Sequence, residues 1–532
     1  MAFTAKEVGL NPRHAVFTPS LSPMYVKCQG THRGRIPPQI TLDDFDFYNP
    51  NKLGFTWQAA LYSAGHASDL KLENPDPERM VTKRDRDKTI MVCDSGGYQI
   101  GNGVLKIDQD LRSASADELR MKILRWLEFN SDYSMIFDWP AWAVGTPKFR
   151  LKTFRDCLNE TKYNNDFFVK HRKAENMKFL NVVQGRTWGW DNEDDPVFNQ
   201  AHGEIYTWYN EVKHYPFNGW AVAGPVSADM YYFLCFLLTA WNDGLINKDK
   251  NWIHVLGKAR PDAAFTMTVI NDCLQRYVDP SLQISYDASS AFLYSVNGQI
   301  LAGHNPLELS IITDTIPNLK KYVGSTEKIP LKGLQSPLTD LLTAGDFCID
   351  LTKNSLIETS VDYGNGLVGI KDTKKNGEYG NYMDTMSYLI SMYHNVWIQI
   401  RCVDEFSNLA LLSIPELKEM EDYYITERKN AWSTRTGNDL RRKMIEKDHI
   451  EEIFKSGDPK QALKELEKRK KYLHDATKTE RVCWLNVTQD LQDNGVLEIV
   501  RDTIKPAKPL TKQEKNKLKP PSIKMDIFEE NT

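Results

Sequence analysis

The sequence predicts an α/β fold: a (β/α)8 TIM barrel with a mostly helical C-terminal extension. Six short apolar runs alternate with longer stretches of helical periodicity, a pattern typical of a parallel sheet. Polar residues stand at or near the end of nearly every apolar run, as they do in barrels whose strands open onto an active site. From about residue 340 the alternation stops, and charged helical segments follow. A doubly wound sheet is the main alternative.

Each predicted strand is short, contains β-branched or aromatic residues, and is bounded by Gly, Pro or Asp. These strands cover residues 89–97, 134–139, 177–185, 218–224, 251–257 and 283–287. Two more are expected near residues 15–20 and after Gly303, which would complete a barrel of eight. The intervening helices are predicted over 116–130, 154–174, 228–245 and 262–278.

We expect the chain to divide into a catalytic barrel over 1–340, a mostly helical extension over 341–500, and a flexible basic tail over 501–532. In the extension, helices are predicted over 385–406 and 414–475. The second of these is interrupted at 456–459, where Asp458 would cap a helix that begins with Pro459. A loop rich in Gly, Asn and Lys is expected at 371–381. The last thirty residues contain seven lysines and four prolines, a composition typical of a flexible chain.

The composition is that of an ordinary globular protein, with 41% hydrophobic and 26% charged residues. It argues against collagen-like, disordered and coiled-coil classes for most of the 532 residues. The net charge of −4 does not indicate a nucleic-acid binder, but local patches matter more than totals. The longest apolar run, 231–241, is too short to cross a membrane, and the N-terminus lacks the apolar stretch of a signal peptide.

The cysteines predict a reduced, intracellular protein. There are eight, and the closest pair, Cys235 and Cys273, is 38 residues apart. No CxxC or CxC pair occurs, which argues against a zinc ribbon or a thioredoxin-like motif.

Five predicted strand ends carry polar side chains: Asp94, Asp138, Gln184, His254 and Asp287. In a barrel these ends would converge on one rim. Two carboxylates from separate strands support covalent glycosyl chemistry, in which one attacks an anomeric carbon and the other handles protons or holds the base. Each residue alone also fits an ordinary helix cap or turn. The series of five is the stronger signal.

The run from Asp94 to Gln99 is the most informative. Its two glycines would let the backbone approach a ligand closely, Tyr98 could stack on a planar ring, and Gln99 could anchor the turn. Asp138 could accept two N–H bonds from a purine-like edge, and Gln184 offers both a donor and an acceptor. Gly224 would bring bare backbone to the same rim. The alternative for each is a tight turn between a strand and a helix.

The order of these motifs resembles that of the tRNA-guanine transglycosylases. The similar elements are DSGGYQ (94–99), FD (137–138), VVQG (182–185), WAVAG (220–224), HVLGKARPD (254–262) and YD (286–287). Asn297-Gly298 stands where the family has an Asn-Gly after its nucleophile, and Tyr393-His394-Asn395 is similar to a later His-Asn pair. The resemblance covers roughly residues 85–300, and DSGGYQ and VVQG in this order are its most specific parts.

Two departures from that family bear on the substrate. The C-x-C-x-x-C zinc cluster is missing, and Cys348 and Cys402 are too isolated to replace it, so no structural zinc is expected. Ala291-Phe292-Leu293 stands where the family has a Pro-Thr-Arg, whose arginine helps to hold tRNA. With its long C-terminal extension, the chain looks more like the branch that exchanges guanine in phage and bacterial DNA for a 7-deazaguanine.

The resemblance implies a role for each matching residue. Asp287 would be the nucleophile, and Asp94 would assist proton transfer or hold the base. The base pocket would be formed by Ser95, Gly97, Tyr98, Asp138, Gln184, Gly185 and Gly224. Arg186, Lys258 and Arg260, which lie just beyond strand ends, would contact nucleic-acid phosphates.

The implied partners are DNA and a 7-deazaguanine base, preQ0 or a derivative, with no cofactor, no metal and no membrane. Such base exchange would modify a genome and protect it against restriction. We expect the protein in the cytoplasm, that of the host if a phage encodes it, and leave homodimer formation open. Two alternatives are a tRNA-guanine transglycosylase without its zinc site and an inactive nucleic-acid-binding barrel.

Overall fold

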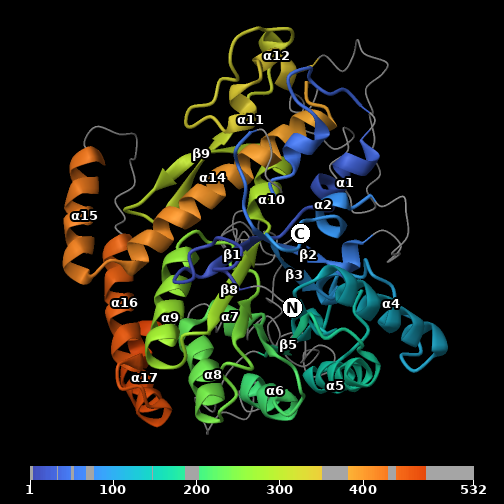
Figure 1. Cartoon of the computed structure of the whole chain (residues 1–532), viewed down its shortest axis with the longest axis vertical. Helices are drawn as coiled ribbons and strands as arrows, with labels where there is room; N and C mark the ends of the chain where they lie inside the picture. Colours follow the sequence, from blue (N-terminus) through green and yellow to red (C-terminus); the bar gives the residue numbers. More distant parts are fainter. Residues whose placement is uncertain are drawn as a thin grey trace, which may run out of the picture.

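The computed structural model describes residues 4–32, 34–48, 53–67, 77–146, 148–185, 203–349, 382–428 and 439–474. Eight parallel strands form a (β/α)8 barrel surrounded by helices, as the sequence predicts (Figure 1). The strands are β1 (Val16–Pro19), β2 (Ala59–Ser63), β3 (Ile90–Asp94), β4 (Tyr133–Met135), β5 (Lys178–Val183), β6 (Gly219–Val222), β7 (Trp252–Val255) and β8 (Gln283–Ala288). They pair in the order β1-β8-β7-β6-β5-β4-β3-β2.

The barrel closes between β1 and β2. A parallel bridge joins Ser20 to Leu61, and the amide of Leu21 donates to the carbonyl of Leu61 at 2.8 Å. The strand predicted at 15–20 is therefore β1, and it pairs with β8 in parallel.

The prediction was wrong about one barrel strand. The eighth strand is β2, whereas the segment after Gly303 lies outside the barrel. There, β9 (Gln299–Asn305) and β10 (Ser310–Thr315) form a separate antiparallel pair. β2 reads Ala-Ala-Leu-Tyr-Ser, and alanine and leucine favour helices, so this segment carries little strand signal of its own.

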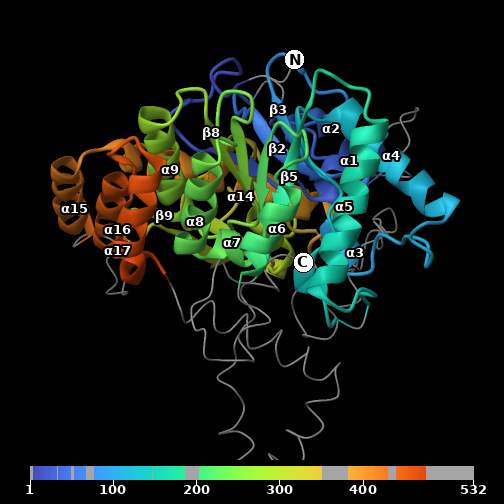
Figure 2. The same ribbon diagram turned by 90° about the horizontal axis from the view of Figure 1, so that it is seen from below.

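The helices that cover the barrel agree with the four predicted ones to within a few residues. They are α1 (Pro23–Thr31), α2 (Arg79–Thr82), α3 (Gly97–Gly101), α4 (Ala114–Asn130), α5 (Phe154–His171), α6 (Glu204–Val212), α7 (Pro225–Ala228), α8 (Met230–Asn242), α9 (Ala263–Tyr277) and α10 (Ser290–Val296). Short 3-10 helices lie at Leu42–Phe45, Ala64–His66, Ala141–Ala143 and Lys320–Tyr322. Figure 2 shows the barrel from the side, with α3 and α7, which follow β3 and β6, on its lower side.

The C-terminal part adds α11 (Pro337–Asp340), α12 (Ala344–Phe347), α14 (Thr385–Leu411), α15 (Ile414–Arg428), α16 (Asp439–Phe454) and α17 (Pro459–Leu473). The long helix α14 packs on α9, α10 and β9 (Figure 1). α17 begins as predicted, because Pro459 opens it and the carboxylate of Asp458 accepts the amide of Gln461 at 2.7 Å. The loop predicted at 371–381 and the tail predicted at 501–532 lie outside the described residues.

Buried charges join the extension to the barrel. On α16, the Nζ of Lys443 donates to the hydroxyl of Thr266 on α9 at 2.7 Å and lies 3.4 Å from Asp262. Lys443 also pairs with Glu446 at 2.7 Å and is only 8% exposed. A buried ammonium group is costly unless it is paired and hydrogen-bonded, so these contacts fix α16 on α9.

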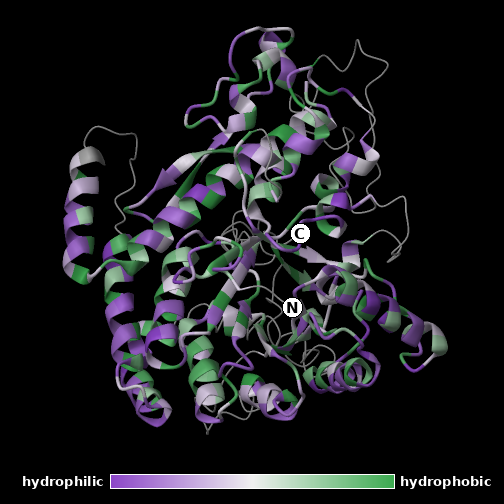
Figure 3. Ribbon diagram, viewed as in Figure 1, coloured by the Kyte–Doolittle hydropathy of each residue, from purple (hydrophilic) through white to green (hydrophobic). Residues whose placement is uncertain are grey.

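The interior is apolar and aromatic. Five tryptophans are almost fully buried: Trp126, Trp139, Trp208, Trp220 and Trp252. Hydrophilic residues predominate along α16 and α17 (Figure 3). In the part of the chain that the structure describes, no helix is long and apolar enough to cross a membrane.

Candidate active site

The carboxyl ends of neighbouring strands bring the predicted polar residues onto one rim of the barrel. Asp94 is the last residue of β3, and Asp287 is the next-to-last residue of β8. Asp138, Gln184 and Gly224 follow β4, β5 and β6 by one to three residues. Because all eight strands are parallel, these positions share the face on which barrel enzymes carry their chemistry.

Asp287 is buried and is held through one carboxylate oxygen. Its Oδ1 accepts the amide of Gly257 at 2.8 Å, and the Nε2 of His254 lies 3.4 Å from the same oxygen. The amide of Lys258 donates to the backbone carbonyl of Asp287 at 2.8 Å. Within the described residues, Oδ2 makes no hydrogen bond. The side chain is therefore held at Oδ1, and within the same residues Oδ2 is left without a hydrogen bond.

Asp94 is the second carboxylate of the rim. The hydroxyl of Ser63 on β2 donates to its Oδ2 at 3.0 Å. Burial raises the pKa of Asp94, and the charge of Asp287 raises it further, against hydrogen bonds from Ser63 and from the Gly96 and Ser95 amides. The two carboxylates therefore interact electrostatically, and burial favours the protonated form of Asp94.

Asp138 is nearly buried and is held by Gln184. The Nε2 of Gln184 donates to Asp138 Oδ2 and to the Trp139 carbonyl, both at 2.9 Å, and its Oε1 accepts the Ala141 amide at 2.8 Å. Burial, and then the charge of Asp94, raises the pKa of Asp138 to about 7. Since both protons of the Gln184 amide are engaged within the protein, Gln184 acts mainly by orienting Asp138 and the loop after it.

The turn after β3 brings backbone against Asp138. Gly96 adopts φ +102°, which favours glycine, and α3 starts directly after it. A Cβ at Gly97 would lie 3.0 Å from Asp138 Oδ1 and 3.1 Å from its carbonyl oxygen, so a side chain there would crowd the carboxylate. Gln99 anchors this turn as predicted, since its Nε2 lies 2.9 Å from the Nε2 of His66.

Tyr98 is half-buried on the same turn. Its ring packs against Trp142 with centroids 5.5 Å apart and an interplanar angle of 36°. Trp142 also packs on the turn itself, since a Cβ at Gly101 would lie 2.9 Å from its ring.

Three other predicted pocket residues differ in what they face. The Ser95 hydroxyl is buried and donates to the Ile136 carbonyl at 3.0 Å. Gly185 has φ +140°, and a Cβ there would lie 2.6 Å from the Ile205 amide, so this glycine is required by the entry into α6. Gly224 has φ +64°, and a Cβ there would meet no atom of the described residues within 4 Å. Of these three residues, Gly224 is therefore the one whose backbone the described part of the chain leaves uncovered.

The three residues predicted to contact phosphate lie in different surroundings. Arg260 is exposed but pairs with Asp262 at 3.1 Å, which reduces the positive charge that it presents. Lys258 is half-buried beside Asp287, and Arg186 lies outside the described residues.

His394 and Asn395 anchor β9. The Oδ1 of Asn395 accepts the Leu301 amide at 2.8 Å, and its Nδ2 donates to the Ser295 hydroxyl at 2.9 Å. The Nε2 of His394 lies 2.8 Å from the Leu301 carbonyl. In the ranges that the structure describes, no group of three or more His, Cys, Asp or Glu residues is arranged to hold a metal ion.

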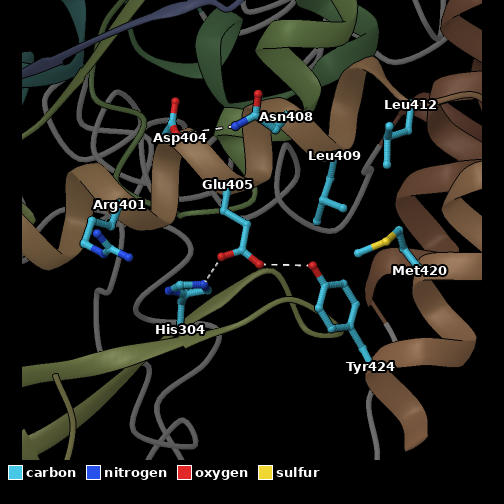
Figure 4. A pocket seen from close by; sticks show the side chains of 9 residues that line it. All are labelled: His304, Arg401, Asp404, Glu405, Asn408, Leu409, Leu412, Met420 and Tyr424. Carbon is cyan, nitrogen blue, oxygen red and sulfur yellow. Dashed lines mark hydrogen bonds and ion pairs between the residues drawn. The ribbon is translucent and has the colours of Figure 1, made fainter. Parts of the chain in front are cut away.

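A cavity of about 380 Å³ lies between β9, α14 and α15, outside the barrel. It is lined by His304, Arg401, Asp404, Glu405, Asn408, Leu409, Leu412, Met420 and Tyr424 (Figure 4). Glu405 accepts the Tyr424 hydroxyl at 3.0 Å and pairs with His304. These contacts tie α15 to α14 and β9.

Sequence reasoning missed two residues that contact the carboxylates. Ser63 lies on β2, the strand that the sequence did not reveal. His254 stood out as a polar strand end but received no role. Its pairing with Asp287 depends on the register of β7 and β8, which places His254 opposite Ser285.

No protein-family model matches the sequence, and no curated protein matches it at a significant level.

Proposed function

We propose that this protein is a DNA-guanine transglycosylase, which exchanges guanine in DNA for preQ0 or a related 7-deazaguanine. The observation that carries the proposal is the pair Asp287 and Asp94 on one rim, next to the buried Asp138. Such a set provides a nucleophile, a proton carrier and a receptor for the base edge. The exchange would modify a genome and protect it against restriction.

The reaction proceeds in two balanced steps. Asp287 attacks C1′ of a deoxyguanosine through Oδ2, the C1′–N9 bond breaks, and its electron pair leaves with guanine. Asp94, whose pKa is raised, supplies the proton that the leaving nitrogen takes. The incoming 7-deazaguanine then gives the proton of the corresponding nitrogen back to the Asp94 carboxylate, that nitrogen attacks C1′, and the C1′–Oδ2 bond breaks with its electron pair returning to the Asp287 carboxylate.

Asp138 receives the base edge. As a carboxylate it accepts two parallel N–H bonds, one from the ring nitrogen and one from the exocyclic amine of guanine. Gln184 holds it in place through Oδ2. Guanine and preQ0 carry the same edge, so one pocket serves the leaving and the entering base. Tyr98 lies beside the pocket, and the bare backbone at Gly224 leaves room at the rim.

Two features favour DNA over tRNA. Leu293 stands where the tRNA-directed family has its arginine, and the preceding Phe292 is buried in α10, where it packs on Tyr25 with centroids 5.3 Å apart. The second feature is the composition of the last thirty residues, whose seven lysines would favour phosphate binding. The target base must be flipped out or single-stranded.

A two-substrate assay tests the proposal. Labelled guanine and labelled preQ0 are offered with DNA and with tRNA side by side, using Asp287→Ala as the control. The proposal predicts label in DNA, none in tRNA and none with the variant. Label in tRNA alone would identify a tRNA-directed enzyme. Binding of DNA without exchange of any base would identify an inactive nucleic-acid-binding barrel.

A further inference from the structure

A column of polar side chains inside the barrel ends at Asp287. Trp252 and His254 alternate along β7, and Ser285 and Asp287 alternate along β8, so all four project from the same face of neighbouring strands. The Nε1 of Trp252 lies 2.7 Å from the Ser285 hydroxyl, and that hydroxyl lies 2.8 Å from the Nδ1 of His254. Trp252, His254 and Ser285 are at most 1% exposed.

The donors of this column fix the tautomer of His254. An indole nitrogen can only donate, so the Ser285 oxygen accepts from Trp252. Within the described residues the hydroxyl proton of Ser285 has no acceptor other than the Nδ1 of His254, so it donates to that nitrogen. A ring that accepts at Nδ1 carries its proton on Nε2. Within the described residues that nitrogen is fully buried, has no hydrogen-bond partner at normal distance, and lies 3.4 Å from Asp287 Oδ1.

We infer that His254 is the positioning residue of the nucleophile. It donates its Nε2 proton to Asp287 Oδ1, together with the Gly257 amide, and so leaves Oδ2 as the attacking oxygen. This inference rests on the proposed function for its kinetic consequence but not for its geometry. The 3.4 Å separation is long for a hydrogen bond, and such contacts tighten when a substrate is bound.

The kinetic test compares His254→Gln with His254→Phe. Glutamine keeps a donor at the position of Nε2, whereas phenylalanine keeps the bulk of the ring and loses the donor. Because His254→Phe removes a hydrogen bond to a charged group, its kcat should fall by about 10- to 100-fold. The KM for the free base should stay within about twofold, because His254 does not contact Asp138 or Gln184. His254→Gln should restore most of kcat.

His394→Phe is the matched control, since His394 is an equally buried histidine that anchors β9 away from the rim. Loss of kcat in this control equal to that of His254→Phe would reduce His254 to a folding role and overturn the inference. An unchanged kcat in His254→Phe, or an equal loss in His254→Gln, would overturn it as well.

A second measurement does not depend on turnover. Long-range ¹H–¹⁵N spectra of the histidine-labelled wild type, with the His254 signal assigned by its loss in His254→Gln, report the tautomer directly. The inference predicts the proton on Nε2, and a proton on Nδ1 would overturn it. If the wild type exchanges no base with any nucleic acid, the proposed function fails, while this spectrum still decides the arrangement of His254.

Discussion

Replacing Asp138 by asparagine should stabilise the protein and abolish its reaction. Burial raises the pKa of Asp138 from 3.8 to about 7. Between these values the folded protein holds a proton that the unfolded chain has lost, so stability falls as the pH rises through this window. The raised pKa lowers the free energy of unfolding by about 1.5 kcal/mol at pH 5 and by about 4 kcal/mol at pH 8. Asparagine removes this cost and still accepts the Gln184 amide.

Thermal unfolding at pH 5 and pH 8 measures the effect. The Tm of Asp138→Asn should exceed that of the wild type at both pH values, and the difference should be larger at pH 8.

Binding of free guanine should weaken by about 10- to 100-fold, because an amide cannot accept two N–H bonds as a carboxylate does. Asp132→Asn is the control: Asp132 is equally buried but pairs with Arg84 at 2.6 Å, so its replacement should destabilise. A Tm difference for Asp138→Asn that does not grow with pH would refute the reasoning.

Three further predictions concern the extension, the tail and metal content. Lys443→Ala removes the buried cation that Asp262 and Glu446 share and should cost about 3–5 kcal/mol in denaturant unfolding. Lys455→Ala, at an exposed position just after α16, should leave the midpoint unchanged, and equal midpoints for the two variants would contradict the docking of α16 on α9. Deleting residues 503–532 should weaken DNA binding, reduce its dependence on salt and leave free-base binding intact; an unchanged salt dependence would place the phosphate contacts elsewhere. Elemental analysis of protein prepared without chelator should find no stoichiometric zinc, and one zinc per chain that is lost in His394→Ala would show that prediction to be wrong.

The sequence was sufficient to predict the barrel and the rim. Six strands carried a β-branched or aromatic run, five of these runs had a polar residue at or near their end, and the parallel arrangement then placed Asp94, Asp138 and Asp287 on one face. The sequence did not predict β2, because its alanines and leucine favour helix over strand. Ser63, which lies on β2 and is the hydrogen-bond partner of Asp94, was therefore not predicted either.

The roles of individual side chains depended on packing that sequence patterns do not encode. Gln184 was expected to read the base, but its amide protons are engaged by Asp138 and Trp139. Gly185 was expected in the pocket, but the entry into α6 explains it. The contact between His254 and Asp287 follows from strand register, which a single sequence does not specify.

The most direct test of the proposal is a search for the covalent intermediate. Wild-type protein is mixed with a guanine-containing DNA oligonucleotide in the absence of free base, quenched, and analysed by intact-protein and peptide mass spectrometry. The account predicts release of guanine and a DNA adduct on the peptide that contains Asp287, which disappears when preQ0 is added and never forms in Asp287→Asn. An adduct on Asp94, or guanine release without any adduct, would contradict it.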